Sequence, residues 1–184
     1  MHTHILLPTD GSELSEHAVN YGVALAKAVN AKVTGVTVSM PFQFIALEPH
    51  LATDTLESYT ARMSTVAAQR LHHVKNAASA AGLECDVVHA QHEHPYRAII
   101  DTAVNRGCDL IVMASHGRRG IAAIVLGSET VKVLTHCTIP VLVYREPQAK
   151  GFFAASGDAN RNRLGSMRTS GSGHWSCSSE VDIF

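Results

Sequence analysis

Two short segments of this chain combine glycine with hydroxyl-bearing and charged residues, a mixture that suits the binding of an anion. The first is PTDGS at residues 8–12, and the second runs from ASHGRRG at residues 114–120 to LGSET at residues 126–130. Glycine beside a helix start lets backbone N–H groups approach an anion closely, and the positive end of the helix dipole attracts it. The hydroxyl groups of Ser128 and Thr130 favour phosphate oxygens. The two segments therefore indicate a phosphate cradle.

The cradle matches neither of two widespread phosphate motifs. The chain contains neither the GxxxxGK[ST] pattern of P-loop proteins nor the GxGxxG pattern that binds dinucleotides. A purely structural interpretation therefore stays open, in which the glycines only form turns and Ser128 only caps a helix.

Strand-like and helix-like segments alternate along the chain and place both glycine segments after strands. Short apolar or β-branched runs predict the strands, and apolar residues spaced by three and four predict the helices. The predicted strands are residues 4–8, 32–38, 85–90, 110–114 and 140–144, and the predicted helices are residues 13–29, 53–81, 96–106 and 128–135. A loop bracketed by Pro41 and Pro49 precedes the long second helix.

This alternation predicts an α/β fold with a three-layer, doubly wound, Rossmann-like architecture. Strands separated by helices of this length pair in parallel through right-handed crossovers, which gives a five-stranded parallel sheet. Ligands of such sheets bind beyond the carboxyl ends of the strands, where the strand order reverses. Both glycine segments follow strands that end there.

The regular pattern ends near Glu146. Residues 147–184 are rich in Gly and Ser and have no sustained apolar period. We therefore expect one folded domain over residues 1–146 and a disordered tail over residues 147–184, with an autoregulatory or partner-binding segment as the alternative for the tail.

Composition excludes several classes of function. Of the 184 residues, 46% are hydrophobic and 17% charged, a globular balance, and the formal net charge is −1. That charge argues against a nucleic-acid partner bound by phosphate neutralisation. No apolar run approaches the ~18 residues of a membrane helix, so we expect no membrane partner and a cytoplasmic location.

The cysteines and histidines offer weaker signals. The four cysteines show no CxxC spacing, so reduced thiols are expected. His89, His92 and His94 resemble a metal cluster, but a strand end and a loop bring such ligands together only by tertiary accident, and we predict no metal site. Among the 12 histidines only His116 lies in the glycine loop, where it would bind phosphate or shape the turn.

Several motifs together resemble the universal stress protein family over residues 1–146. They are PTDGS after the first strand, MASHG after the fourth, nine intervening residues 118–126, and then GSETVKVL and PVLVY. Nucleotide-bound members share a GxxG pattern, nine residues and G[ST]. The resemblance implies the strand order 3-2-1-4-5 and binding of an adenine nucleotide, ATP, with or without Mg²⁺.

The resemblance also assigns residues to the expected site. Asp10 matches an aspartate and Val38 a backbone contact that address adenosine, while Gly117, Gly127 and Ser128 match the glycine pattern. With their neighbours in the same loops, the predicted nucleotide-binding residues are Pro8, Thr9, Asp10, Val38, Met113, Ala114, His116, Gly117, Arg118, Gly127, Ser128, Glu129 and Thr130.

Two residues depart from an ideal cradle. Ala114 replaces the first glycine of the pattern, and its methyl group fits only if the backbone there has a negative φ. Glu129 repels phosphate unless its carboxylate points away. Arg118 and Arg119 would supply compensating positive charge.

The expected function is an ATP-binding, homodimeric stress-response module without assigned catalytic residues, capable at most of very slow ATP hydrolysis. The alternatives are a nucleotide-free interaction protein of the same fold and an adenylating or ATP-hydrolysing enzyme. Residues 140–144 form an apolar edge strand that proteins normally cover or pair. The resemblance implies that two copies pair through this strand.

Overall fold

The computed structural model describes residues 1–45, 55–117 and 126–146. These residues belong to one compact unit spanning Met1–Pro147. Its strands are β1 (His4–Pro8), β2 (Lys32–Ser39), β3 (Cys85–Gln91), β4 (Leu110–Ala114) and β5 (Val141–Tyr144). Its helices are α1 (Glu13–Val29), α2 (Phe42–Ile45), α3 (Leu56–Ala81), α4 (Pro95–Arg106) and α5 (Ser128–His136).

The five strands form one parallel sheet in the order β3-β2-β1-β4-β5, which confirms the predicted fold and strand order. β1 lies in the middle, with Pro8 opposite Val36 of β2 and Leu6 opposite Ile111 of β4. The chain leaves β1 toward one face and β4 toward the other, so the gap between their carboxyl ends is the switch point of the sheet.

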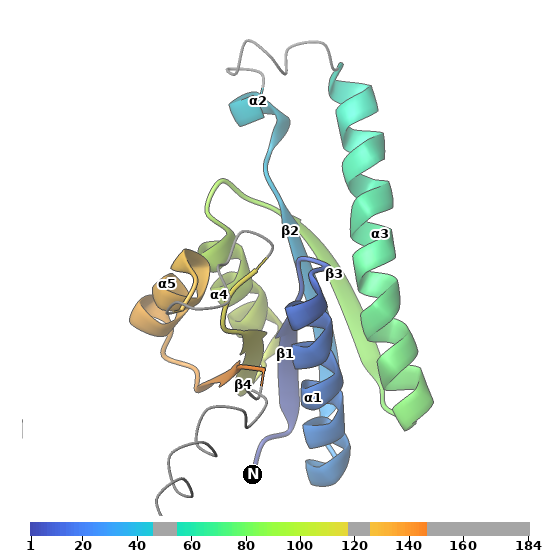
Figure 1. Cartoon of the computed structure of the whole chain (residues 1–184), viewed down its shortest axis with the longest axis vertical. Coiled ribbons are helices and arrows are strands. Elements are labelled where there is room, and N and C mark those ends of the chain that lie inside the picture. The colour runs from blue at the N-terminus through green and yellow to red at the C-terminus, as the bar shows by residue number, and fades with distance from the viewer. Residues whose placement is uncertain (46–54, 118–125, 147–184) are drawn as a thin grey trace, which may run out of the picture. The chain divides into compact units, whose positions relative to one another are not determined.

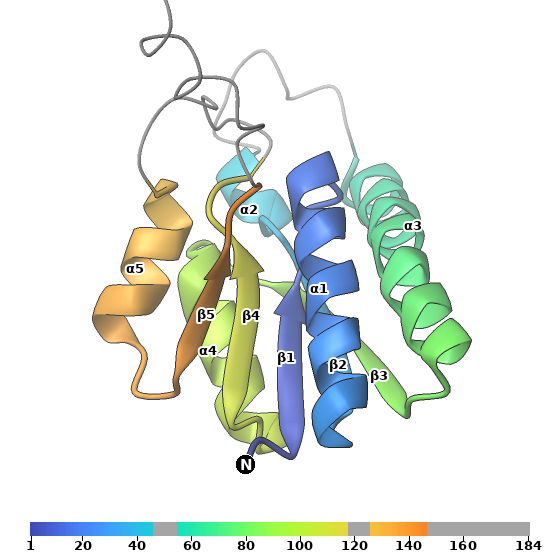
Figure 2. The same cartoon turned by 60° about the horizontal axis from the view of Figure 1, so that its bottom comes forward.

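Alternate side chains of the central strands enter two separate apolar cores. Ile5 and Leu7 of β1 pack with Val74 of α3 on the face covered by α1 and α3. Leu6 packs with Ile99 and Val133 on the face covered by α4 and α5. Figures 1 and 2 show these helix pairs on opposite sides of the sheet. The two-residue period of the strands therefore holds the three layers together.

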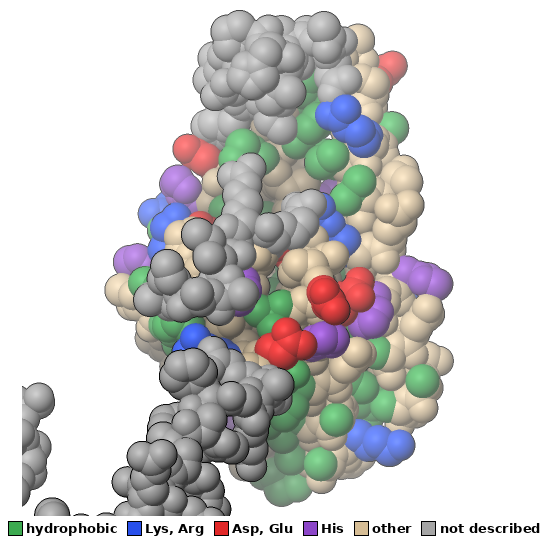
Figure 3. Space-filling view, viewed as in Figure 1, with side chains coloured by type: hydrophobic (Ala, Val, Ile, Leu, Met, Phe, Trp, Pro, Cys, Tyr) green, Lys and Arg blue, Asp and Glu red, His purple; other side chains and the backbone are tan. Residues whose placement is uncertain are grey.

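The helix starts follow from local capping. Ser12 accepts a hydrogen bond from the backbone N–H of Ser15 at 3.3 Å and so begins α1. Acidic Glu13 and Glu16 occupy the first turn of α1, where the helix dipole favours them. The Nδ1 atom of His17 lies 3.4 Å from a carboxylate oxygen of Glu146. Figure 3 shows acidic and histidine side chains gathered near the start of this helix.

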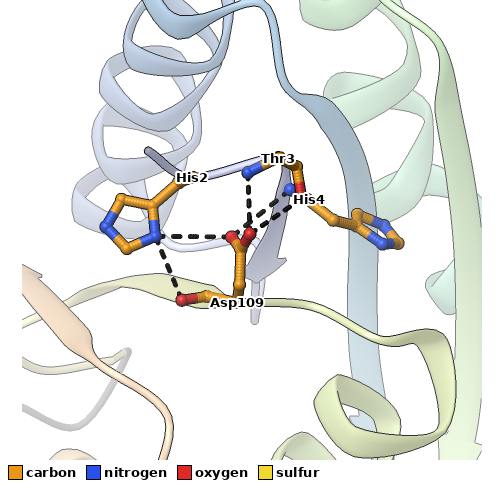
Figure 4. Close-up of polar contacts among 4 residues, drawn as sticks. All are labelled: His2, Thr3, His4 and Asp109. Carbon is orange, nitrogen blue, oxygen red and sulfur yellow. Dashed lines mark hydrogen bonds and ion pairs between the residues drawn. The ribbon is translucent and has the colours of Figure 1, made fainter.

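A polar clamp joins the amino ends of β1 and β4, at the edge opposite the switch point (Figure 4). One carboxylate oxygen of Asp109 accepts hydrogen bonds from the backbone N–H and the hydroxyl of Thr3, at 2.7 and 2.8 Å. The other accepts one from the backbone N–H of His4 at 3.3 Å and lies 3.3 Å from Nδ1 of His2. The clamp fixes the register of the two strands.

The structure differs from the sequence prediction at one short element. Residues 42–45 form α2 within the stretch we predicted as a loop. The ring of Phe42 lies 5.5 Å from that of Tyr59, so packing against α3 supports a turn of helix that has too little periodicity to detect. The predicted tail, residues 147–184, lies outside the described residues. Within the described part, no helix is both long and apolar enough to span a membrane.

Candidate functional site

A cavity of about 790 Å³ lies at the carboxyl ends of the central strands, at the switch point. Every predicted nucleotide-binding residue except Arg118 lines it; Arg118 and Arg119 lie outside the described residues. The lining residues that we had predicted are Pro8, Thr9, Asp10, Val38, Met113, Ala114, His116, Gly117, Gly127, Ser128, Glu129 and Thr130. The fold thus brings two distant loops and one strand end together, and contact of these residues with a ligand stays a prediction.

The loop after β1 is held by its own side chains. Asp10 accepts hydrogen bonds through Oδ1 from the backbone N–H of Ser12 at 3.0 Å and from its hydroxyl at 2.7 Å. Thr9, which is buried, accepts one from the backbone N–H of Gly11 at 3.1 Å. Asp10 therefore shapes the turn, as the structural interpretation of this residue requires.

The loop after β4 meets the β1 loop at Gly117. A Cβ atom added to Gly117 would lie only 2.5 Å from Oδ2 of Asp10, so the carboxylate packs directly against this glycine. The φ of Gly117 is not positive, unlike those of three other described glycines. Gly117 is therefore needed for close approach to Asp10 rather than for a left-handed turn.

The start of α5 approaches the same loop through a second glycine. The N–H of Gly127 donates a hydrogen bond to the carbonyl of Ser115 at 2.7 Å. A Cβ atom on Gly127 would lie 3.1 Å from the Cα of His116, tighter than ordinary packing. Gly127 therefore lets the amino end of α5 lie directly against the carboxyl end of β4.

This amino end is chemically suited to an anion. Gly127 is the N-cap of α5 and provides no side-chain hydrogen bond to the helix. The first backbone N–H of α5 with a helical partner is that of Val131, which donates to the carbonyl of Gly127 at 3.0 Å. The N–H groups of Ser128, Glu129 and Thr130 precede it in the first turn, where the helix itself supplies no acceptor. Together with the helix dipole they form a region that favours negative charge.

The hydroxyl of Thr130 has a structural role that the sequence did not predict. Oγ1 of Thr130 donates a hydrogen bond to the carbonyl of Ala114 at 3.0 Å, and the side chain is buried. Because this hydrogen bond uses the hydroxyl proton of Thr130, the hydroxyl cannot also donate it to a phosphate oxygen. Ser128 retains the role that we predicted for both hydroxyls.

Neither departure from the ideal cradle closes the site. Ala114 is the last residue of β4, and its φ is not positive, so its methyl group causes no backbone strain. Glu129 accepts a hydrogen bond through Oε2 from the backbone N–H of Tyr96 at 2.9 Å, and its Oε1 lies 2.9 Å from Nζ of Lys132. The carboxylate of Glu129 thus points toward the start of α4.

The far end of the cavity offers backbone groups of Val38. In β2 the carbonyl of Val36 accepts a hydrogen bond from Thr9 at 2.8 Å, on the side facing β1. Val38 is two residues further along and directs its N–H and carbonyl to the same side, beyond the last paired residue of β1, Pro8. These two groups suit the paired donor and acceptor on the edge of a nucleobase.

The cavity also contains residues that the sequence did not single out: Ser15, Val36, Met40, Arg70, Glu93, Pro95 and Ile99. Arg70 comes from α3, and its Nη1 lies 3.5 Å from the hydroxyl of Thr37. Tyr59, also on α3, donates a hydrogen bond to the carbonyl of Met40 at 2.6 Å, and burial raises the pKa of this phenol. Nothing in the helical periodicity could have indicated which residues of α3 reach the end of β2.

The histidines do not assemble into a metal centre among the described residues, where no group of three potential ligands lies close enough together. His89 instead contacts the hydroxyl of Ser39 through Nε2 at 2.8 Å, and burial lowers the pKa of this imidazole. His92 accepts a hydrogen bond through Nδ1 from the backbone N–H of His94 at 2.8 Å. His116 lies in the cavity wall with Nδ1 3.2 Å from the hydroxyl of Ser115.

Comparison with known proteins identifies similar chains. The model of the universal stress protein family matches residues 1–145. Universal stress protein MJ0531 of Methanocaldococcus jannaschii is 29% identical over 150 residues, covering 80% of this chain and 85% of that protein. The solved structure of protein MJ0577, also from M. jannaschii, superposes with a TM-score of 0.68 at 25% identity, covering 81% of this chain and 99% of the other.

A further solved structure is a universal stress protein in complex with cAMP. It superposes with a TM-score of 0.56 at 23% identity, and the match covers 78% of this chain and 97% of the other. At that identity the likeness supports the fold alone.

Proposed function

This chain belongs to the universal stress protein family, and from that premise we propose that it is a module that binds an adenine nucleotide, with ATP as the first candidate. The observation that carries the proposal is the start of α5, whose N-cap provides no side-chain hydrogen bond and which lines the same cavity as Asp10 and Val38. A helix start of this kind favours phosphate. The resemblance of Asp10, Val38 and the glycine pattern to those of nucleotide-bound family members is the reason for choosing an adenine nucleotide.

In the proposed complex each part of the cavity has its own task. The N–H and carbonyl of Val38 would pair with the base edge, and Oδ2 of Asp10, which lies against Gly117, would accept a hydrogen bond from a ribose hydroxyl. The N–H groups of the first turn of α5 and the hydroxyl of Ser128 would bind phosphate oxygens. Mg²⁺ would arrive with ATP, since this ion is commonly held by substrate phosphates and water.

We further propose that two copies pair through β5. On one side β5 pairs with β4, and no other described strand pairs with it. Its four residues are half-buried, and Tyr144 packs against the ring of Tyr21 at 5.6 Å. An open apolar edge of this kind favours strand pairing. Size-exclusion chromatography with light scattering should give a dimer, and a strictly monomeric mass at working concentration would contradict this part of the proposal.

We propose a cytoplasmic location for this module. The described cysteines Cys85, Cys108 and Cys137 are free thiols, which suit a reducing compartment. Cell fractionation would test the location.

A nucleotide-free interaction protein is the second candidate, and the observation in its favour is the carboxylate of Glu129 in the cavity wall. Calorimetric titration with ATP distinguishes the two. We expect saturable binding to the wild-type protein and at least tenfold weaker binding to Gly127→Val, because a branched side chain would push α5 away from His116. Gly127→Ala, at a φ of −61°, should keep binding within a few-fold.

Native mass spectrometry of protein purified without added nucleotide reports bound ligand and subunit count together. Thermal unfolding of Gly127→Val must remain cooperative for its binding result to count, and the titration of the wild-type protein alone carries the test if it does not. A wild-type protein without saturable binding at millimolar ATP would overturn the nucleotide proposal in favour of the second candidate.

A further inference from the structure

We infer that Glu129 is a specificity-determining residue of this site, which reduces the affinity gained from each phosphate beyond the first. The inference rests on the proposed nucleotide site and concerns what the site distinguishes. Glu129 is the second residue of α5, so its backbone N–H belongs to the proposed phosphate cradle while its side chain carries a negative charge beside it. One residue therefore supplies both an attraction and a repulsion for the ligand.

Two hydrogen bonds hold the carboxylate of Glu129, a residue that lines the cavity. Tyr96 donates its backbone N–H to Oε2 and Lys132 donates through Nζ to Oε1, each at 2.9 Å. Tyr96 lies in the first turn of α4, a helix whose N-cap, His94, makes no side-chain capping bond. Glu129 therefore caps α4 from a neighbouring helix, which explains why the carboxylate is held in the cavity wall.

The charges that line the cavity reinforce this effect. Among the lining residues that the structure describes, Asp10, Glu93 and Glu129 are acidic and Arg70 is basic. Arg70 packs against Gly11 and lies 3.5 Å from Thr37, which places it toward the end of β2 where the nucleoside is expected. Glu129 lines the cavity and Lys132 is not among its lining residues, so the negative charge of this ion pair belongs to the cavity wall.

The Coulomb energy between Glu129 and a ligand grows with the charge of that ligand. Adenosine carries no charge, AMP about two negative charges and metal-free ATP about four near neutral pH. The amide groups of α5 can contact only a few phosphate oxygens, whereas the repulsion acts on every added charge within a Debye length. The site should therefore distinguish adenine nucleotides by the number of their phosphates.

Glu129→Gln tests the inference, because its amide oxygen can still accept the hydrogen bond from Tyr96 while the charge is lost. Affinities for adenosine, AMP and ATP are measured by calorimetry at low ionic strength with EDTA present. We expect the variant to bind ATP about three- to tenfold more tightly than the wild type, AMP by a smaller factor, and adenosine unchanged. The gain for ATP should shrink as salt is added.

Two variants serve as controls. Glu84→Gln makes the same charge change on an exposed residue just before β3, at the opposite edge of the sheet, and should leave all three affinities unchanged. Lys132→Gln removes the positive charge beside Glu129 and should weaken the binding of ATP more than that of AMP.

An unchanged ratio of ATP to AMP affinity in Glu129→Gln would overturn the inference, as would an equal gain for adenosine. Those results would leave the nucleotide site itself in place. A wild-type protein that binds none of the three ligands would overturn the proposed function and the inference together. Thermal unfolding of each variant confirms that the fold is intact, and Lys132→Gln keeps the inference testable if Glu129→Gln does not fold.

Discussion

Replacing Gly117 with alanine should destabilise the protein by displacing the carboxylate of Asp10. The new methyl carbon would lie 2.5 Å from Oδ2 of Asp10, whereas real contacts of this kind lie beyond 3.0 Å, so the carboxylate must move. Movement strains its hydrogen bonds from Ser12, at 3.0 and 2.7 Å. A hydrogen bond to a charged group contributes about 1.5–3 kcal/mol to the free energy of unfolding, and the two bonds from Ser12 are only partly buried.

The backbone contributes in the opposite direction. Because the φ of Gly117 is not positive, alanine fits the local conformation and gains about 0.4–1 kcal/mol by restricting the unfolded chain. We therefore expect a net loss of about 1 kcal/mol in the free energy of unfolding. For a domain of this size that loss lowers Tm by about 3 °C.

A double-mutant cycle measured by urea denaturation identifies the cause. In an Asp10→Ala background the clash is absent, so Gly117→Ala should be neutral or slightly stabilising, giving a coupling of about 1–2 kcal/mol. Loss of the same free energy in both backgrounds, within about 0.5 kcal/mol, would refute the assignment of Gly117 to carboxylate packing.

Three further predictions follow from the described contacts. Thr130→Val should lower the free energy of unfolding by about 1–3 kcal/mol, because the buried carbonyl of Ala114 loses its donor, whereas Thr130→Ser should recover most of that loss in the same denaturation assay. Burial alone raises the pKa of Asp109, but hydrogen bonds from Thr3 and His4 outweigh it and hold the pKa below its usual value. The wild type should therefore exceed Asp109→Asn in stability above about pH 4, and this advantage should vanish as the pH falls through the lowered pKa of Asp109; a gap that persists in acid would contradict it. Burial raises the pKa of Cys108 to about 11, so roughly a thousandth of its thiol groups are ionised at pH 8. Mass spectrometry should therefore find Cys108 alkylated only after unfolding, whereas the partly exposed Cys137 should react in the native protein.

The fold could be predicted from the sequence because its signals are local and repeated. The predicted ranges of β1 and β4 agree with the structure residue for residue, since each is a short apolar run bounded by turn-forming residues. The predicted end of α3 at Ala81 is also confirmed, with Gly82 as its C-cap. The short helix α2 was not predicted because a single turn, supported by the ring of Tyr59, is too short to show a helical spacing of apolar residues.

The candidate site could be predicted only in outline. Loops that follow neighbouring strands must meet at one edge of a parallel sheet, so Asp10 and Gly117 could be assigned to one cavity from the sequence. Which atoms face each other depends on side-chain geometry between distant elements. The bond from Thr130 to Ala114 and the contact between Glu129 and Tyr96 are of this kind, and no local pattern indicates them.

The two helices on one face of the sheet explain how an acidic residue is compatible with an anion site. Both α4 and α5 begin beside the cavity, and neither receives a side-chain bond from its own N-cap. Glu129 supplies an internal carboxylate to the first turn of α4, whereas the first turn of α5 receives no such bond from its N-cap. The chain therefore satisfies one of two neighbouring helix starts with its own charge and leaves the other suited to a ligand. The sign of the charge at position 129 then affects how much negative charge that ligand can carry.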